Sequence, residues 1–372
     1  MPQEQTEDWY HIRDVDQIDS PALVVYRERM QENIHRLIKM AKYPENLRPH
    51  VKTSKMQEVC AAMLRAGIRQ FKCATIAEAE MLAMTGAGDV LLAYQPVGPK
   101  IDRLLALINK YPDTRFSCLT DNPEAVKALS RVLLEAAVEL SLWIDLNVGM
   151  NRTGILQGDA AQLYRVISHL PNIRVIGIHA YDGHLRDPDP KKRKAKADKV
   201  FKVISELRQT LEHEFSVPLK IVLGGSPTFP MHAQREAVQC SPGTFVFWDW
   251  GYQHSFPDQP FAYAALVITR VISIIDPHTL CLDLGHKSVA AENPLPRVHF
   301  LNAPEMEPVS QSEEHLVVKV SGDRVFAIGE VLYGVPVHIC PTVALYERAV
   351  IIEENKPAGE WKVLARDRKI SV

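Results

Sequence analysis

The stretch Arg48-Pro49-His50-Val51-Lys52-Thr53-Ser54-Lys55 decides the fold. Arg48, His50 and Lys52 alternate, which predicts a strand, and apolar side chains at helical spacing follow over residues 55–66. A lysine at the end of a buried strand is costly to bury, and desolvation lowers its pKa. A neutral amine is what a Schiff base requires, so Lys52 is a candidate nucleophile. The alternative is a lysine whose charged end reaches solvent.

Short apolar runs and helical patterns alternate on both sides of this stretch. Such alternation predicts βαβ units and a parallel sheet. About eight units over roughly 200 residues fit a closed (β/α)8 TIM barrel. An open doubly wound sheet is the alternative, but no Gly-x-Gly-x-x-Gly follows an early strand. The expected strands are 48–53, 71–75, 89–94, 115–119, 141–147, 174–181, 219–224 and 237–240, and the expected helices are 27–41, 55–66, 76–85, 122–136, 160–170 and 200–215.

After about residue 255 the pattern changes to short apolar runs separated by turn residues, which predicts an all-β domain. The strand expected at 22–26 precedes the barrel and is assigned to the same domain. We therefore expect an α/β barrel over 27–255 and a C-terminal β domain over 256–372, joined by the N-terminal segment 1–26. The expected β-domain strands are 262–275, 278–284, 316–320, 324–328 and 335–339.

Composition excludes several classes of protein. The chain has 372 residues, 46% hydrophobic and 24% charged, with a formal net charge of −2, so we expect no nucleic-acid or membrane partner. No apolar run is long enough to span a bilayer. The acidic, polar N-terminus is unlike a signal peptide, and the six cysteines have no framework spacing. Reduced thiols in a cytoplasmic protein are therefore expected.

Two segments are candidates for a phosphate site. The seventh strand ends in Gly224-Gly225-Ser226, and the eighth ends in Ser241-Pro242-Gly243-Thr244. Barrel enzymes often hold phosphate after these two strands. Glycine lets backbone N–H groups approach an anion, and Ser and Thr add hydroxyl donors. Tight turns are the alternative reading of each glycine segment.

Three further side chains are candidates at the ends of strands. Arg152 lies in a glycine-rich loop after the fifth strand, where its planar cation suits a carboxylate or the ring of a cofactor. Tyr181 and His184 follow the sixth strand and are candidates for ring stacking and acid–base chemistry. The alternatives are a solvated Arg in a turn and structural histidines, His179 among them.

His338 and Cys340 are candidates for metal ligands. If both lie on one strand, their side chains point the same way. Imidazole and thiolate suit Zn²⁺, and two protein ligands leave positions open for water or substrate. The alternative is a strand-borne His beside an inert, buried Cys.

These motifs together resemble the D-threonine aldolase and D-serine dehydratase family of alanine-racemase-like, fold-type III pyridoxal-phosphate enzymes. Residues 48–55 are similar to its Arg-Pro-His-x-Lys-Thr-x-Lys motif, and Pro242 to Thr244 to its Pro-Gly-Thr. The resemblance implies catalytic roles for Lys52, Tyr181 and His184, and a divalent metal on His338 and Cys340, with zinc favoured over manganese or magnesium. It implies that pyridoxal 5'-phosphate is held by Lys52, His50, Arg152, Tyr181, Gly224, Gly225, Ser226, Gly243 and Thr244.

The chain departs from the family pattern at two positions. Ser54 stands where the family usually has His between Thr and the second Lys. Phe245 stands where Tyr often follows Pro-Gly-Thr. The second change removes a phenol, so the sequence does not name a partner for the pyridine nitrogen of the cofactor.

The resulting hypothesis is a lyase, dependent on pyridoxal phosphate and a divalent metal, that acts on small β-hydroxy D-amino acids as a cytoplasmic homodimer. Retro-aldol cleavage and β-elimination remain alternatives. A racemase of the same fold would share Lys52 and the barrel but has no need of His338 and Cys340. A non-catalytic cofactor carrier would be a barrel alone, and residues 256–372 argue against it.

Overall fold

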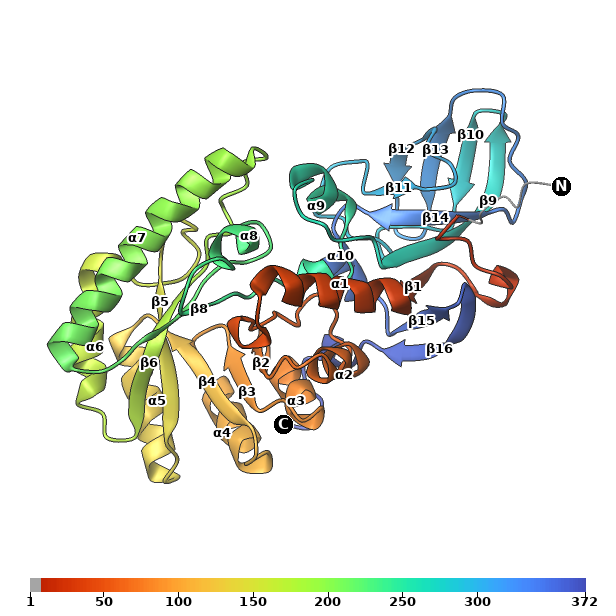
Figure 1. The fold of residues 1–372 in the computed structure, drawn as a ribbon. Helices are drawn as coiled ribbons and strands as arrows, with labels where there is room; N and C mark the ends of the chain where they lie inside the picture. The colour runs from red at the N-terminus through yellow and green to blue at the C-terminus, as the bar shows by residue number, and fades with distance from the viewer. Residues whose placement is uncertain (1–7) are drawn as a thin grey trace.

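A computed structural model describes residues 8–372, as two β-sheets with helices packed around the first (Figure 1). Part of the N-terminal segment expected to join the β domain, and most of the polar stretch that argued against a signal peptide, lie in residues 1–7, outside the described part.

Seven parallel strands form the barrel sheet in sequence order, β2 to β8. The predicted barrel fold is confirmed, with an eighth position in the ring that is filled by an irregular segment. The strands are β2 (Gln70–Cys73), β3 (Asp89–Leu92), β4 (Arg115–Thr120), β5 (Leu140–Leu146), β6 (Ile173–Ala180), β7 (Lys220–Val222) and β8 (Val238–Gln239).

Residues 46–51 close the ring between β8 and β2. The backbone N–H of Arg48 donates to Cys240 O at 2.8 Å, and that of His50 donates to Pro242 O at 3.0 Å. On the other side, Val51 N donates to Lys72 O at 3.0 Å. The predicted strand 48–53 is wrong as a continuous strand, because Pro49 has no N–H to donate and a turn begins at Val51.

Helices follow most of the barrel strands. Their starts follow local chemistry: Thr75, Asn122 and Asp189 each accept hydrogen bonds from first-turn N–H groups. In the described chain no helix is both long and apolar enough to cross a bilayer. The helices are α1 (Arg27–Ala41), α2 (Gln57–Arg65), α3 (Ile76–Met84), α4 (Pro99–Lys110), α5 (Pro123–Glu135), α6 (Gln157–Ser168), α7 (Pro190–Phe215), α8 (Phe229–His232), α9 (Trp250–Ser255) and α10 (Ile339–Val343), of which α4, α8, α9 and α10 were not predicted.

The second sheet has nine strands in the order β12-β13-β10-β9-β1-β15-β16, with β14 pairing with both β9 and β11. Strand β1 pairs with β9 and β15, so the first strand does join the C-terminal sheet. The boundary between 255 and 256 stays a prediction. The strands are β1 (Ala22–Tyr26), β9 (Ala265–Asp276), β10 (Thr279–Leu282), β11 (Val298–Phe300), β12 (Met306–Gln311), β13 (Leu316–Val320), β14 (Val331–Pro336), β15 (Arg348–Glu353) and β16 (Lys356–Lys362).

The strand predicted at 324–328 is wrong. This segment is irregular: Val325 and Ile328 are exposed, and Phe326 packs into the core without a strand pairing. Two other predicted strands are confirmed: β13 has the expected bounds, and β10 lies within the expected range.

The barrel interior has an apolar middle with a polar layer at its base. Leu91, Leu119, Trp143 and Val222 pack together in the middle. Below them Arg48 is 1% exposed and donates hydrogen bonds to Asp89 at 2.5 Å, Gln70 at 2.8 Å and Gln239 at 3.0 Å. A buried guanidinium therefore plugs the end of the barrel at which the strands begin.

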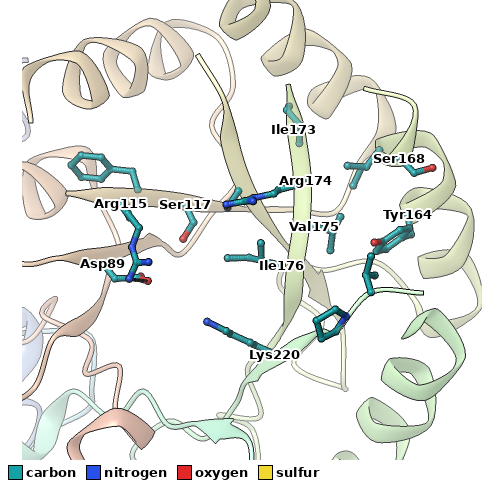
Figure 2. Close-up of a pocket in the computed structure, with 15 residues that line it drawn as sticks. Asp89, Arg115, Ser117, Tyr164, Ser168, Ile173, Arg174, Val175, Ile176 and Lys220 are labelled. Atoms are coloured by element: carbon teal, nitrogen blue, oxygen red, sulfur yellow. Dashed lines mark hydrogen bonds and ion pairs between the residues drawn. The ribbon is translucent and has the colours of Figure 1, made fainter. Parts of the chain in front are cut away.

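A cavity of about 590 Å³ lies at this base. Figure 2 shows Arg115, Arg174 and Lys220 projecting from β4, β6 and β7 toward it, beside Asp89. In barrel enzymes the active site lies at the opposite face, at the carboxyl ends of the strands. The cavity also contains none of the predicted site residues.

We expect Arg48→Met to lower the free energy of unfolding by about 3 kcal/mol, because it leaves the largely buried Asp89 carboxylate without its closest partner. Denaturation in urea, followed by circular dichroism, measures the change. Arg115→Met is the matched control: its side chain is 83% exposed, lies 3.7 Å from the same carboxylate, and should cost less than about 1 kcal/mol. Equal effects of the two variants would contradict the proposed plug.

Candidate active site

A second cavity, of about 520 Å³, lies at the carboxyl ends of the barrel strands. The segment that carries His338 and Cys340 forms part of its wall, together with residues from α9. The cavity is lined by all of the predicted site residues except Gly224 and His184. The residues chosen from separate parts of the sequence therefore meet at one place.

Lys52 lies in the turn that ends the closing segment, and its side chain is exposed within the cavity wall. The expectation that burial would activate this amine is therefore wrong, because the chain turns at the barrel rim before Lys52. Its backbone N–H donates to His50 Nδ1 at 3.3 Å. Burial, reinforced by the charges of Lys72 and Lys52, holds the pKa of His50 well below its usual value. Ser54 is buried in the turn and does not line the cavity.

The two glycine segments are joined through Ser226. Its hydroxyl accepts the N–H groups of Gly243 and Thr244, each at 3.3 Å. A side chain at Gly243 would place its Cβ 2.8 Å from His50 O, so only glycine fits between this loop and the closing segment. Gly224 has φ of +91°, a conformation that favours glycine. Backbone and hydroxyl donors thus gather at the ends of β7 and β8.

Asp182 forms hydrogen bonds with two residues of the segment that follows β7. It was not identified as a site residue from the sequence. Its buried carboxylate accepts from Thr228 Oγ1 at 2.7 Å and bonds His232 Nε2 at 2.8 Å. An acidic residue directly after a strand was the available signal. No motif indicated that His232, fifty residues later, would be its partner.

Tyr181 borders the cavity, and the cations of Arg152 and Lys72 lie near its ring. The guanidinium carbon of Arg152 lies 5.1 Å from the centre of its ring. A Cβ at Gly225 would lie 2.6 Å from Tyr181 Cε2, so this glycine makes room for the ring. His184, in contrast, is exposed, lies against Gly149 and does not line the cavity.

His338 and Cys340 do not share a strand face, which corrects the sequence prediction. Strand β14 ends at Pro336, His338 caps α10, and Cys340 lies in the first turn of that helix. The reason is distant in sequence: the buried Asp249 carboxylate accepts from Ile339 N at 3.1 Å and holds the start of the helix.

The two side chains nevertheless interact directly. Burial lowers the pKa of His338, but the hydrogen bond and charge of Cys340, the charge of Asp249 and the hydrogen bond to Glu292 together outweigh burial and raise the pKa to about 9. Burial raises the pKa of Cys340, and the hydrogen bond and charge of His338, together with the charge of Lys52, more than reverse this and lower it. Glu292 Oε1 lies 2.6 Å from His338 Nδ1 and orients the imidazole.

Cys340 also connects the segment that follows β14 to the mouth of the barrel. Its sulfur lies 3.1 Å from Thr53 Oγ1, beside Lys52, and 3.6 Å from Thr244 Oγ1 in the β8 loop. Across residues 8–372, no cluster of three or more His, Cys, Asp or Glu side chains converges as a metal site. The imidazole and thiol are therefore a pair of donors at the cavity wall.

Lys72 is the buried amine of this site, and sequence reasoning missed it. It is 3% exposed, donates to Ser241 Oγ at 2.6 Å, and lies 3.3 Å from His179 Nε2. Burial, reinforced by the charges of Lys52, Arg152 and Arg48 and opposed by that of Asp145, lowers its pKa from 10.5 to about 7. The only signal was a lysine between two apolar residues of a short strand.

Comparison with known proteins identifies the family. Residues 25–249 match the description "Alanine racemase, N-terminal domain", which is more than half of the chain. The chain belongs to the alanine racemase N-terminal domain family. Residues 264–352 of this alanine-racemase-family chain match "Putative serine dehydratase domain". The resemblance inferred from the motifs is thereby confirmed.

The relatives of this alanine-racemase-family chain include a D-threonine aldolase from Arthrobacter sp, 25% identical over 357 residues that cover 94% of this chain and 93% of the relative. Among solved structures, D-threonine aldolase from Filomicrobium marinum superposes with a TM-score of 0.87 at 24% identity, covering 96% of this chain and 98% of that one. D-threo-3-hydroxyaspartate dehydratase from Delftia sp. superposes with a TM-score of 0.82 at 22% identity, covering 93% and 98%.

The depressed pKa of Lys72 predicts a pH-dependent stability of the cofactor-free protein. Between about pH 7 and 10.5 Lys72 is protonated in the unfolded chain and has released its proton in the folded chain, so the free energy of unfolding rises with pH. Below pH 7 Lys72 is protonated in both states, and the folded protein bears the full cost of burying the charge. Relative to Lys72→Met, the wild type should gain about 1 kcal/mol per pH unit in this window. Urea unfolding of both proteins at pH 7, 8 and 9 measures the difference, and parallel pH profiles would contradict the assignment.

Proposed function

We propose that the protein is a pyridoxal-phosphate-dependent lyase that acts on β-hydroxy D-amino acids with the help of a divalent metal. One observation carries the proposal: Cys340 Sγ contacts both Thr53, next to Lys52, and Thr244 in the β8 loop. An amine, a set of anion donors and a pair of metal-binding side chains therefore border one cavity.

The residues present fit the cofactor. The Ser226 hydroxyl accepts from Gly243 N and Thr244 N and keeps its own proton to donate, and a hydroxyl held among backbone N–H groups is suited to a phosphate. Lys52 offers an accessible amine to which the cofactor aldehyde would be joined. Tyr181, with Arg152 over its ring, provides an aromatic side for the pyridine. A cavity of about 520 Å³ has room for the cofactor together with a small substrate.

The chain's own side chains supply binding and proton transfer. When bound, the cofactor supplies an electron sink for the charge left on Cα when a bond to it breaks. Lys52, at the rim, is the base placed to take or return a proton. Arg152 is exposed beside Tyr181 and is suited to bind the substrate carboxylate. His50, neutral because of its lowered pKa, borders the same space without adding charge.

His338 and Cys340 fit a divalent metal of the zinc type. Imidazole nitrogen and thiolate sulfur are preferred zinc ligands, and the two side chains are close enough to share a hydrogen bond. Glu292 on His338 Nδ1 is the carboxylate that such a ligand commonly has behind it. The metal would bind the β-hydroxyl of the substrate and stabilise charge that develops there. A cysteine-to-alanine variant of a D-threo-3-hydroxyaspartate dehydratase was solved in the metal-free form.

We further propose a cytoplasmic homodimer. The six cysteines are free thiols in the structure, as expected for a reducing compartment. Sedimentation of the purified protein measures the oligomeric state directly.

We expect Lys52 to carry the cofactor. After reduction with borohydride, mass spectrometry of the digested protein should find the cofactor on the peptide that contains Lys52, and Lys52→Ala should abolish turnover. Lys55 is the internal comparison, because it is engaged by the buried Glu78 and should stay unlabelled. A label on Lys55 or Lys72 would contradict the assignment.

We expect metal removal to damage either lyase reaction far more than cofactor binding. In β-elimination the hydroxyl is a poor leaving group without a cation, and in retro-aldol cleavage a cation would stabilise the oxygen as it loses its proton. The assay follows D-threonine, D-serine and D-threo-3-hydroxyaspartate, with glycine and aldehyde reporting the aldolase and keto acid with ammonia reporting the dehydratase. His338→Ala and Cys340→Ala should lose metal and lyase activity while keeping the visible absorption of the cofactor. Cys281→Ala, far from the cavity lining, is the control for losing a thiol. Full activity in metal-free protein would contradict the metal's role, and racemisation without cleavage would favour the alternative enzyme.

A further inference from the structure

A hydrogen-bonded row of polar side chains lies directly beneath the active-site cavity, where barrels usually have apolar residues. Asp145 Oδ1 lies 2.7 Å from His179 Nδ1, and His179 Nε2 lies 3.3 Å from Lys72 Nζ. Lys72 Nζ then donates to Ser241 Oγ at 2.6 Å. The Asp145 carboxylate accepts a hydrogen bond from the Nδ1–H group of His179. Nε2 of the same ring then carries no proton and can accept a hydrogen bond from Lys72. Thr153 completes the row by donating to the second Asp145 oxygen at 2.8 Å.

The amine of Lys72 has one more donor than this row uses. A lysine ammonium can donate three hydrogen bonds. Within residues 8–372, its hydrogen-bond partners are His179 and Ser241. Lys72 lines the cavity, and its Nζ lies 5.8 Å from the centre of the Tyr181 ring. A third donor position is thus left on the cavity side of a side chain that is otherwise buried.

The structure of pyridoxal phosphate indicates which of its atoms would contact the Lys72 amine. The ring nitrogen lies across the pyridine ring from the aldehyde carbon. Lys52, which takes the aldehyde in the proposed function, is at the exposed rim, and the phosphate donors are in the loops after β7 and β8. A ring anchored there turns its nitrogen toward the barrel interior. Ser241, which holds Lys72, directly precedes the Pro242–Thr244 loop.

We propose that Lys72 contacts the ring nitrogen of the cofactor, with Ser241 and His179 holding its amine in place. The inference rests on the proposed function and adds the partner that the sequence leaves unnamed. Phe245, at the position where related sequences often have Tyr, is buried against Phe261 and does not line the cavity. The partner therefore comes from β2.

The contact is suited to share a proton. As an ammonium, Lys72 donates to an unprotonated ring nitrogen; as a neutral amine, it accepts from a protonated one. Its lowered pKa, about 7, makes both forms accessible near neutrality. The ring nitrogen controls how well the cofactor accepts charge from Cα, so this contact would set its strength as an electron sink.

The test compares two cofactors on each protein: pyridoxal 5'-phosphate and its 1-deaza analogue, in which a C–H replaces the ring nitrogen. The dissociation constant of each is measured by titrating the cofactor-free protein and following fluorescence. We expect the wild type to bind the natural cofactor about tenfold more tightly than the analogue, as for loss of one charge-assisted hydrogen bond. In Lys72→Met this ratio should fall close to one, and in Ser241→Ala it should fall partway.

Lys220→Met is the matched control, because it makes the same change at the opposite end of the barrel, in the base cavity (Figure 2). It should keep the wild-type ratio. The ratio is internal to each preparation, so a general loss of affinity in Lys72→Met does not change it. An unchanged ratio in both Lys72→Met and Ser241→Ala would overturn the inference alone. Failure of the wild type to bind either cofactor would overturn the proposed function as well.

Discussion

The backbone hydrogen bonds of residues 46–51 to both sides of the barrel sheet are the constraint on which the rest of the structure depends. Without them β2 and β8 would be open edges. Because the segment is extended as far as His50, Arg48 and His50 both face the interior, one at the base and one at the mouth. The turn at Val51 then brings Lys52 onto the rim. One short segment thus sets the depth of the site.

The two ends of the barrel interior use buried charge differently. At the base, Arg48 is matched by the carboxylate of Asp89, so the charge is compensated within the fold. At the mouth, Lys72 is held by a neutral hydroxyl and an imidazole, and cations surround it. An amine buried without a direct counter-charge costs stability. Folding rules are commonly broken in this way at functional sites, where a ligand completes the interaction.

Sequence periodicity was sufficient to predict the barrel, because alternating strands and helices have few other solutions. It failed where distant residues decide local structure. Cys340 was placed on a strand, but the carboxylate of Asp249 caps the start of α10 and ends the extended conformation there. Lys72 was missed because a single lysine in a four-residue strand does not reveal which face it occupies. Most of the chosen residues do line one cavity, because the strand count placed their motifs at the carboxyl ends independently of local detail.

The site is divided between the two sheets, and this division has a chemical consequence. The barrel supplies Lys52, Lys72 and the loops after β7 and β8, which are the groups suited to the cofactor. The segment after β14 supplies His338 and Cys340, which are suited to the part of the substrate that leaves. At the cavity wall the two sets are joined directly: the sulfur of Cys340 contacts Thr53 and Thr244. Asp249 holds the N–H of Ile339, and Gly251 N donates to Val337 O at 3.1 Å. In the proposed function, the barrel therefore holds the cofactor while the segment after β14 acts on the part of the substrate that leaves.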